Sequence, residues 1–161
     1  MDVVDGEADW GRVAGALAPG LLRLAVMLTG STTDAEDLLQ ATFARAQRHG
    51  RRIAAMAAPA AYLRTVMVNE HVSDRRRRRL RTVPLEHDVP TTAPVEVEHD
   101  VWGWLATLPR QQRAALVLRF YEDLPDGEIA AALGCSAATV RSHVSRGLAS
   151  LRAALVTEET R

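Results

Sequence analysis

At 161 residues the chain is long enough for one domain or two very small ones, and its hydrophobic content of 47% is enough for a core. Its formal net charge is zero, so bulk charge gives no argument for polyanion binding, and its single cysteine, Cys135, excludes an internal disulfide. Aromatic residues make up only 4%, so the core must rest on Leu, Val, Ala and Ile. β-branched runs are rare, and this composition predicts helices rather than sheet.

The first half of the sequence predicts several helices with recognisable ends. We expect a short helix at residues 10–17 and a second one that begins near Pro19 and ends at Gly30. Thr33, with Glu36 three residues later, has the spacing of a capping box, so the next helix should begin there and end at Gly50. Its buried positions at helical spacing are Ala35, Leu38, Leu39, Thr42, Phe43 and Ala46.

After a loop or weak helical turn at 51–58, Pro59 should begin a long helix that runs into the arginines at 75–79. Residues 81–98 contain three prolines and several acids without a helical period, which predicts a flexible linker. The fold class is therefore all-α, with two small helical domains, 10–80 and 99–156, joined by that linker.

The second domain should begin with a helix whose apolar positions are Val101, Trp102, Leu105 and Leu108. Pro109 should open the next helix, which is expected to bury Ala114, Val117, Leu118 and Tyr121. Helices at 126–133 and 137–155 should follow.

Charge is unevenly distributed along the chain. Residues 45–81 hold eleven arginines against two acids, and the segments on either side are acidic. All twenty basic residues are Arg, for which codon bias in a GC-rich genome is the simplest explanation, although the guanidinium fork also suits phosphate. This asymmetry indicates a localised polyanion-binding surface.

Residues 128–152 have the pattern of a helix-turn-helix. Gly134 permits the left-handed turn that ends the first helix, and Ser136 can cap the second. Val140, Val144, Leu148 and Leu151 form the inner face of that second helix, and Ala138, Arg141, Ser142, Ser145 and Arg146 lie opposite. An ordinary helical hairpin explains the apolar stripe but not the Arg-bearing outer face, so we expect this helix to lie in a major groove.

Three motifs in order resemble a known family. DAEDLLQATFARAQR (34–48) and PAAYLRTVMVNEHVSDRRRRR (59–79) resemble region 2 of sigma-70 factors, and LPRQQRAALVLRFYEDLPDGEIAAALG with SAATVRSHVSRGLASLR resembles region 4. Region 2, a short linker and region 4 is the layout of extracytoplasmic-function sigma factors of RNA polymerase, and the resemblance covers residues 10–155.

The resemblance implies a non-enzymatic protein that binds core RNA polymerase, directs it to promoter DNA and assists melting, with no cofactor. It implies polymerase binding by Asp34, Asp37 and Gln40. It implies −10 recognition and melting by Tyr62, Asn69, Ser73, Arg75, Arg76 and Arg77. Recognition of the −35 element is implied for Ser136, Thr139, Arg141, Ser142, Ser145 and Arg146. An anti-sigma factor is a further partner that the family commonly has.

Some positions depart from the family pattern. Tyr62 stands where Trp is usual, Ser73 stands where Asp is frequent, and Pro125 replaces the usual Ser or Thr cap. The first two put the −10 preference in doubt, and the third predicts a weaker cap for the first helix of the turn.

Other functions explain less of the chain. A stand-alone helix-turn-helix regulator leaves 34–79 without purpose, and an Arg-rich RNA-binding or scaffold protein explains only the basic run. Cys135 lacks the partners of a zinc site, and Ser142, His143 and Ser145 lack an orienting acid for nucleophilic catalysis. The longest apolar run, 21–28, is broken by Arg23 and too short for a bilayer, and the acidic amino terminus resembles no signal peptide, so we expect a cytoplasmic protein without membrane insertion.

Overall fold

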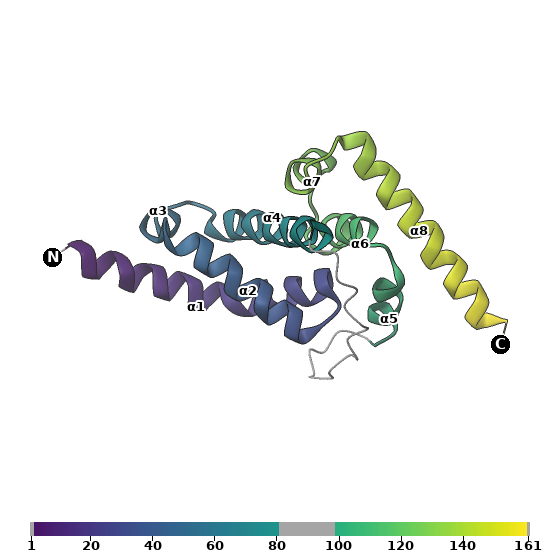
Figure 1. Cartoon of the computed structure of the whole chain (residues 1–161), viewed down its shortest axis with the longest axis horizontal. Helices are drawn as coiled ribbons and strands as arrows, with labels where there is room; N and C mark the ends of the chain where they lie inside the picture. Colours follow the sequence, from purple (N-terminus) through teal and green to yellow (C-terminus); the bar gives the residue numbers. More distant parts are fainter. Residues whose placement is uncertain (1, 81–98, 161) are drawn as a thin grey trace. The chain divides into compact units, whose positions relative to one another are not determined.

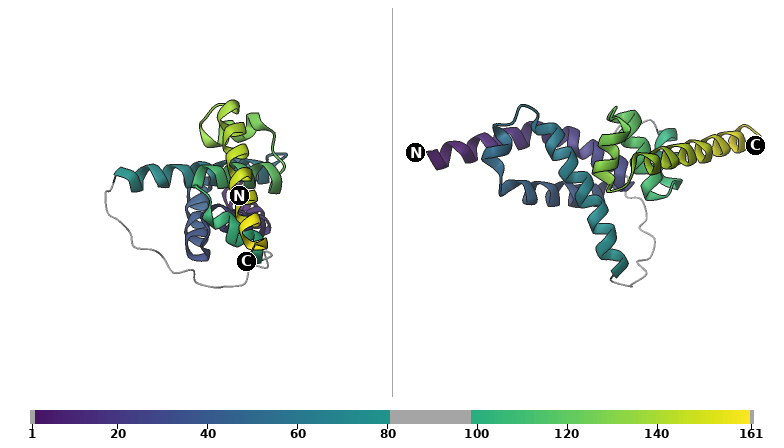
Figure 2. Two further views of the ribbon diagram at one scale, coloured as in Figure 1. Left: turned by 90° about the vertical axis from the view of Figure 1, so that its right-hand side faces the viewer. Right: turned by 90° about the horizontal axis from the view of Figure 1, so that it is seen from above.

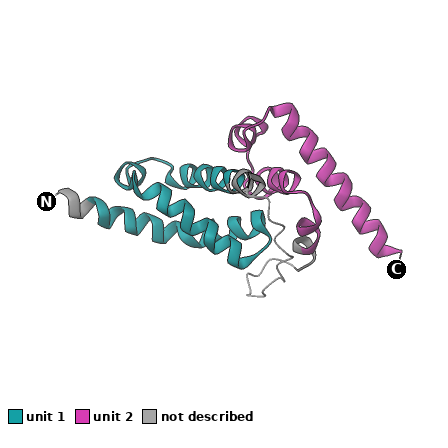
Figure 3. Ribbon diagram, in the orientation of Figure 1, with its two compact units in different colours: residues 1–93 teal, residues 94–161 magenta. Residues whose placement is uncertain are grey.

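A computed structural model of the chain describes the backbone of residues 2–80 and 99–160 and the side chains of residues 6–73 and 103–160. Within these ranges every regular element is a helix, which confirms the predicted all-α class. The chain divides into two compact units, Met1–Ala93 and Pro94–Arg161 (Figure 3). The predicted linker, 81–98, lies outside the described residues.

The first unit contains α1 (Asp2–Thr29), α2 (Thr32–Gln47), α3 (Gly50–Ala54) and α4 (Pro59–Leu80). The chain turns back after α1, so that α2 runs alongside it in the opposite direction, and α4 packs against both (Figures 1 and 2). Its largest fully buried side chains are Leu24, Leu28, Ile53, Leu63, Met67, Val68 and Thr42. The predicted start of α4 at Pro59 is confirmed.

The prediction of two helices before Gly30 is wrong, because α1 runs without interruption through Pro19. Proline removes one backbone donor and leaves the carbonyl of Gly15, four residues earlier, without its helical partner. Both Pro19 and Gly15 are exposed, so water can solvate that carbonyl and the helix continues.

Because the two predicted segments form one helix, α1 contains a long apolar stretch. The stretch Gly6–Thr29 is long and apolar enough to cross a membrane by those two measures alone. Its second half supplies much of the core of the first unit, with Leu21, Leu24, Ala25, Val26, Met27 and Leu28 all buried. A core helix of a soluble domain passes the same two measures.

The ends of α2 also differ from the prediction. Ser31, not Thr33, is the N-cap, and its Oγ accepts a hydrogen bond from the Asp34 backbone N–H at 3.3 Å. Gly50 begins α3 rather than stopping α2. It is buried against Trp10, whose Cγ would lie 2.8 Å from an added Cβ, and Trp10 packs edge-on against Phe43. The predicted stripe is confirmed for Ala35, Leu38, Thr42 and Ala46, whereas Leu39 and Phe43 are half-buried.

The second unit contains α5 (His99–Thr107), α6 (Arg110–Leu116), the π-helix η1 (Val117–Tyr121), α7 (Asp126–Leu133) and α8 (Ala137–Glu159). Its core is built from Leu105, Leu108, Ala114, Ala115, Leu116, Val117, Leu118, Ile129, Leu133 and Val140. Pro109 precedes α6 as predicted. The side chains of Val101 and Trp102 lie outside the described residues.

The prediction that Tyr121 is buried is wrong, since its side chain is 46% exposed. The helix that starts at Arg110 widens into a π-turn, in which the Glu122 N–H bonds to the Val117 carbonyl five residues earlier at 3.1 Å. A wider turn rotates every later residue about the helix axis relative to an α-helical count. Tyr121 therefore leaves the face that buries Val117 and Leu118.

Candidate nucleic-acid interface

The turn between α7 and α8 has the predicted geometry. Gly134 ends α7 with φ of +68°, in the left-handed region that glycine adopts without a steric cost. Ser136 then caps α8, because its Oγ accepts a hydrogen bond from the Thr139 backbone N–H at 3.1 Å. Pro125 precedes α7 without a side-chain cap, as its chemistry predicts. The turn fixes the direction in which α8 leaves the body of the second unit (Figure 1).

The two faces of α8 divide as the sequence predicts. Val140 is fully buried, and Val144, Leu148 and Leu151 are half-buried. The opposite residues Ala138, Arg141, Ser142, Ser145 and Arg146 are all exposed. Among the other candidate −35 contacts, Ser136 is exposed and Thr139 is half-buried with its hydroxyl 2.9 Å from the Ser136 Oγ. The first turns of α8 thus present hydroxyls and two guanidinium groups on one side, the groups that contact bases and phosphates.

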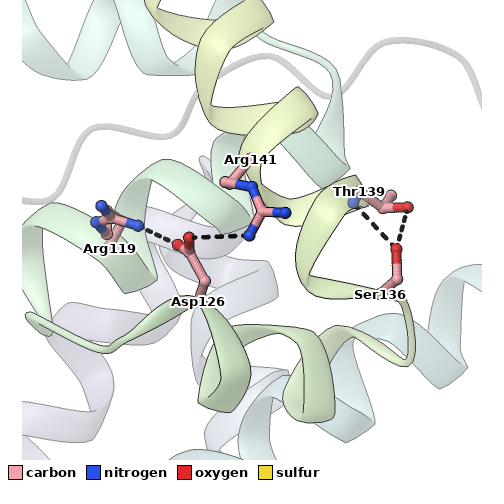
Figure 4. Close-up of polar contacts among 5 residues, drawn as sticks. All are labelled: Arg119, Asp126, Ser136, Thr139 and Arg141. Atoms are coloured by element: carbon pink, nitrogen blue, oxygen red, sulfur yellow. Dashed lines mark hydrogen bonds and ion pairs between the residues drawn. The ribbon is translucent and has the colours of Figure 1, made fainter.

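A carboxylate next to this surface has no counterpart in the sequence prediction. Asp126, the first residue of α7, accepts a hydrogen bond from Arg119 of η1 and lies 3.8 Å from Nη1 of Arg141 in α8 (Figure 4). No local pattern points to these contacts, because the three residues come from three elements.

His143 and Cys135 show burial rather than reactivity. The pKa of His143 is lowered, first by burial and then by the charge of Arg146. Burial raises the pKa of the Cys135 thiol, so it carries less thiolate than an ordinary cysteine. Across residues 6–73 and 103–160, no three His, Cys, Asp or Glu side chains come together to hold a metal ion.

In the first unit, the candidate polymerase contacts follow one face of α2. Asp37 and Gln40 are exposed and Asp34 is half-buried, while Ala35, Leu38 and Thr42 on the other side are buried. Residues at i, i+3 and i+6 of a helix are near neighbours, so the structure brings these three side chains together. The negative charge of Asp34 also lies in the first turn, where the helix dipole favours it.

The candidate −10 residues lie along α4. Tyr62 is 38% exposed, Asn69 is exposed and Ser73 is half-buried. The helix continues to Leu80, but the side chains of Arg75, Arg76 and Arg77 lie outside the described residues.

The helices α2 and α4 are held together by charge as well as by packing. Glu70 of α4, whose side chain is only 12% exposed, accepts a hydrogen bond from Arg45 of α2. The pair ties the helix with the candidate polymerase contacts to the helix with the candidate −10 contacts. Sequence spacing places Arg45 on an outward face and does not reveal this partner.

Comparison with known proteins matches both units to one family. Residues 14–81 match sigma-70 region 2, and residues 101–151 match sigma-70 region 4. The chain is 39% identical over 144 residues to the RNA polymerase sigma-E factor of Streptomyces coelicolor, which is 86% of this chain and 81% of that protein. It is 34% identical over 145 residues to the ECF RNA polymerase sigma factor SigL of Mycobacterium tuberculosis, covering 84% of this chain and 82% of the relative.

A solved structure has a similar fold. The sigma factor RpoE of Bartonella quintana, crystallised with the anti-sigma factor NepR, aligns with a TM-score of 0.73 at 25% identity, over 91% of this chain and 96% of that one.

Proposed function

We propose that separate sets of residues carry out the separate tasks of this chain, which belongs to the extracytoplasmic-function group of the sigma-70 family of RNA polymerase sigma factors. As a member of that group it directs RNA polymerase to promoters, binds core polymerase and promoter DNA, and is not an enzyme. Each of these tasks falls to its own set of residues. The observation that carries the proposal is the presence of one exposed polar face in each unit, acidic on α2 and Arg-bearing on α8.

Residues 10–80 and 99–156 are the two working domains in this proposal. The first docks on core polymerase through Asp34, Asp37 and Gln40. Support comes from the exposure of Asp37 and Gln40 and from the rigid backing that α1 and α4 give to α2. A protein partner with a basic surface would complement this face.

The long helix α4 is proposed to open the duplex. Tyr62 offers a flat ring on which an unpaired base can stack, and Asn69 offers an amide that can bond to a base edge. Ser73 continues the same face, and Arg75, Arg76 and Arg77 would hold neighbouring phosphates. The exposure of Tyr62 and Asn69 supports this assignment, since both side chains are free to meet a base.

The second domain is proposed to recognise the −35 element through α8. Arg141 and Arg146 contact bases or phosphates, and Ser142 and Ser145 add hydroxyl contacts. Ser136 and Thr139 position the first turn through the capping bond and can also reach the backbone. The exposure of Arg141, Ser142, Ser145 and Arg146 on one side of α8 supports this role.

We also propose an anti-sigma factor as a regulatory partner and the cytoplasm as the location of the protein. Support for the partner is the likeness to RpoE of Bartonella quintana, a sigma factor crystallised with an anti-sigma factor. Support for the location is the task itself, because core polymerase and promoter DNA are cytoplasmic in bacteria.

A charge reversal on α2 tests the docking assignment. Asp37→Arg should lower affinity for core polymerase at least about tenfold, because like charges at an interface are costly, and should leave the melting temperature unchanged since Asp37 is exposed. Binding is measured by fluorescence anisotropy with purified core, and run-off transcription reports function. Glu159→Arg, an equal charge reversal at the end of α8, is the control and should keep full core affinity. Unchanged core affinity in Asp37→Arg would remove the acidic face of α2 from docking.

A further inference from the structure

The carboxylate of Asp126 is shared between two arginines from different elements (Figure 4). Its Oδ1 accepts a hydrogen bond from Nη1 of Arg119, at the π-turn that precedes α7. Its Oδ2 lies 3.8 Å from Nη1 of Arg141, one helix further along, in α8. At that separation the second contact is an ion pair rather than a direct hydrogen bond. Each carboxylate oxygen therefore serves one guanidinium.

The three charged side chains differ in how far they are exposed to solvent. The Asp126 side chain is 22% exposed, that of Arg119 is 41% exposed and that of Arg141 is 63% exposed. The carboxylate is anchored on the body of the unit by Arg119, and Arg141 extends from it towards solvent. Exposed ion pairs contribute little to stability, so the effect of this contact falls mainly on where the Arg141 guanidinium lies.

We propose that Asp126 is a positioning residue that restrains Arg141 for reading a base of the −35 element. This inference rests on the proposed role of Arg141 in DNA recognition. A guanidinium has five N–H donors in a fixed fork. A contact at Nη1 leaves the remaining donors free for a bidentate pair, such as the one that arginine makes with guanine. A side chain that is already oriented loses less conformational freedom when it binds.

The same carboxylate acts against binding that does not depend on sequence. Asp126 places a negative charge beside a surface that meets phosphates, and it partly neutralises Arg141 in the free protein. Its removal should therefore raise affinity for any duplex through the phosphates. Affinity for the preferred duplex gains less, because Arg141 is no longer held in its reading position. The two affinities respond unequally, whereas an acid without a positioning role changes both in parallel.

Binding to DNA by the reconstituted holoenzyme, the full chain with core polymerase, tests this inference. Duplexes randomised over the −35 region are selected with the unaltered holoenzyme, and dissociation constants are then measured for one selected duplex and for its scrambled counterpart at one salt concentration. Asp126→Asn keeps the shape of the side chain and removes its charge. We expect it to lower the ratio of selected to scrambled affinity about fivefold, the size of a coupling between residues in contact.

Glu128→Gln is the matched control. It removes the same charge from an exposed position in the first turn of the same helix. It should leave the affinity ratio within about twofold, because a change in charge that acts only through the phosphates affects both duplexes alike. The double variant Asp126→Asn with Arg141→Ala should give the same ratio as Arg141→Ala alone, because there is then no arginine to position.

The outcomes separate this inference from the function on which it rests. If Arg141→Ala lowers the ratio and Asp126→Asn leaves it unchanged, the positioning role is overturned and DNA reading by Arg141 stands. If Arg141→Ala leaves the ratio unchanged, both the proposed reading role and its positioning by Asp126 are overturned. Should Asp126→Asn lower the melting temperature, Asp126→Glu replaces it. That variant keeps the charge but displaces the carboxylate, and an unchanged ratio would again overturn the inference.

Discussion

His143 lies half-buried in α8, and within the described part of the chain its Nδ1 makes no hydrogen bond. Its pKa is lowered by burial and, to a smaller extent, by Arg146. At pH values between the lowered pKa of His143 in the folded chain and its ordinary pKa of about 6.5 in the unfolded chain, the unfolded chain binds more protons than the folded chain. Stability therefore rises with pH in that window and falls as pH drops through it.

We expect the second unit to lose stability on acidification from pH 7 through about 6.5 and below, and His143→Gln to remove that part of the loss. Urea unfolding between pH 5 and pH 7.5, followed by tryptophan fluorescence in a Trp10→Phe background, reports on the second unit, where the other tryptophans lie. Arg146→Gln should weaken the pH dependence only in part, because Arg146 is the smaller of the two causes. An unchanged slope in His143→Gln would contradict this explanation.

Individual residues differ in how far their roles can be predicted from the sequence. Gly134 and Ser136 are predictable, because the left-handed turn and the N-cap each depend on one residue and its immediate neighbours. Asp126 is not, because its role depends on two arginines that only the folded chain brings near it. A position that requires a special backbone conformation can be recognised from the sequence, whereas charged partners that come from three different elements cannot.

At the scale of elements, the packing of α8 on α6 depends on the absence of a side chain. An added Cβ at Gly147 would lie 2.8 Å from Cδ1 and 3.2 Å from Cγ of Leu116, which is itself buried. We expect Gly147→Ala to destabilise the second unit by about 1 kcal/mol, since overpacking costs roughly 1–3 kcal/mol and the helix propensity of alanine returns up to about 1 kcal/mol.

Chemical denaturation measures this change, and Gly103→Ala is its control. Gly103 is exposed in α5, and an added Cβ there meets nothing within 4 Å. That substitution should stabilise the unit by about 0.5–1 kcal/mol through backbone entropy alone. If both substitutions stabilise equally, α6 and α8 do not pack as tightly as the structure indicates.

The existence of the helices is predictable, but some of their limits are not. The apolar spacing of 3.6 residues identifies α2, α7 and α8 in the sequence, and Pro59 marks the start of α4. Pro19 predicts a break, yet the exposure of that side of α1 lets the helix continue. Ser31 rather than Thr33 caps α2. Residues 31–33 are three consecutive hydroxyl residues that satisfy similar capping rules, so the sequence alone does not select between them. The π-turn at Val117–Tyr121 leaves no recognisable pattern, so the exposure of Tyr121 could not be foreseen.

At the scale of the whole molecule, opening a promoter duplex requires free energy to unstack and unpair its bases. Unstacking a base costs a few kcal/mol, and stacking a free base on an aromatic ring contributes about 1–3 kcal/mol whatever the base. Tyr62 and Asn69 are seven residues apart, so they lie on one face of α4, and both are exposed. One such surface can offset much of the cost of extruding a base.

Asn69→Ala should therefore leave formation of the closed complex nearly intact, because a duplex promoter presents no free base to Asn69. Formation of the open complex should fall by about tenfold, the equivalent of one lost hydrogen bond to a base edge. A template with a pre-melted bubble at −10 should largely restore it, since the bubble supplies the unstacking energy. Permanganate footprinting of thymines on duplex and bubble templates measures the difference, and Thr157→Ala, at an exposed position near the end of α8, is the control. Equal defects on both templates, or a defect on neither, would remove Asn69 from the melting role.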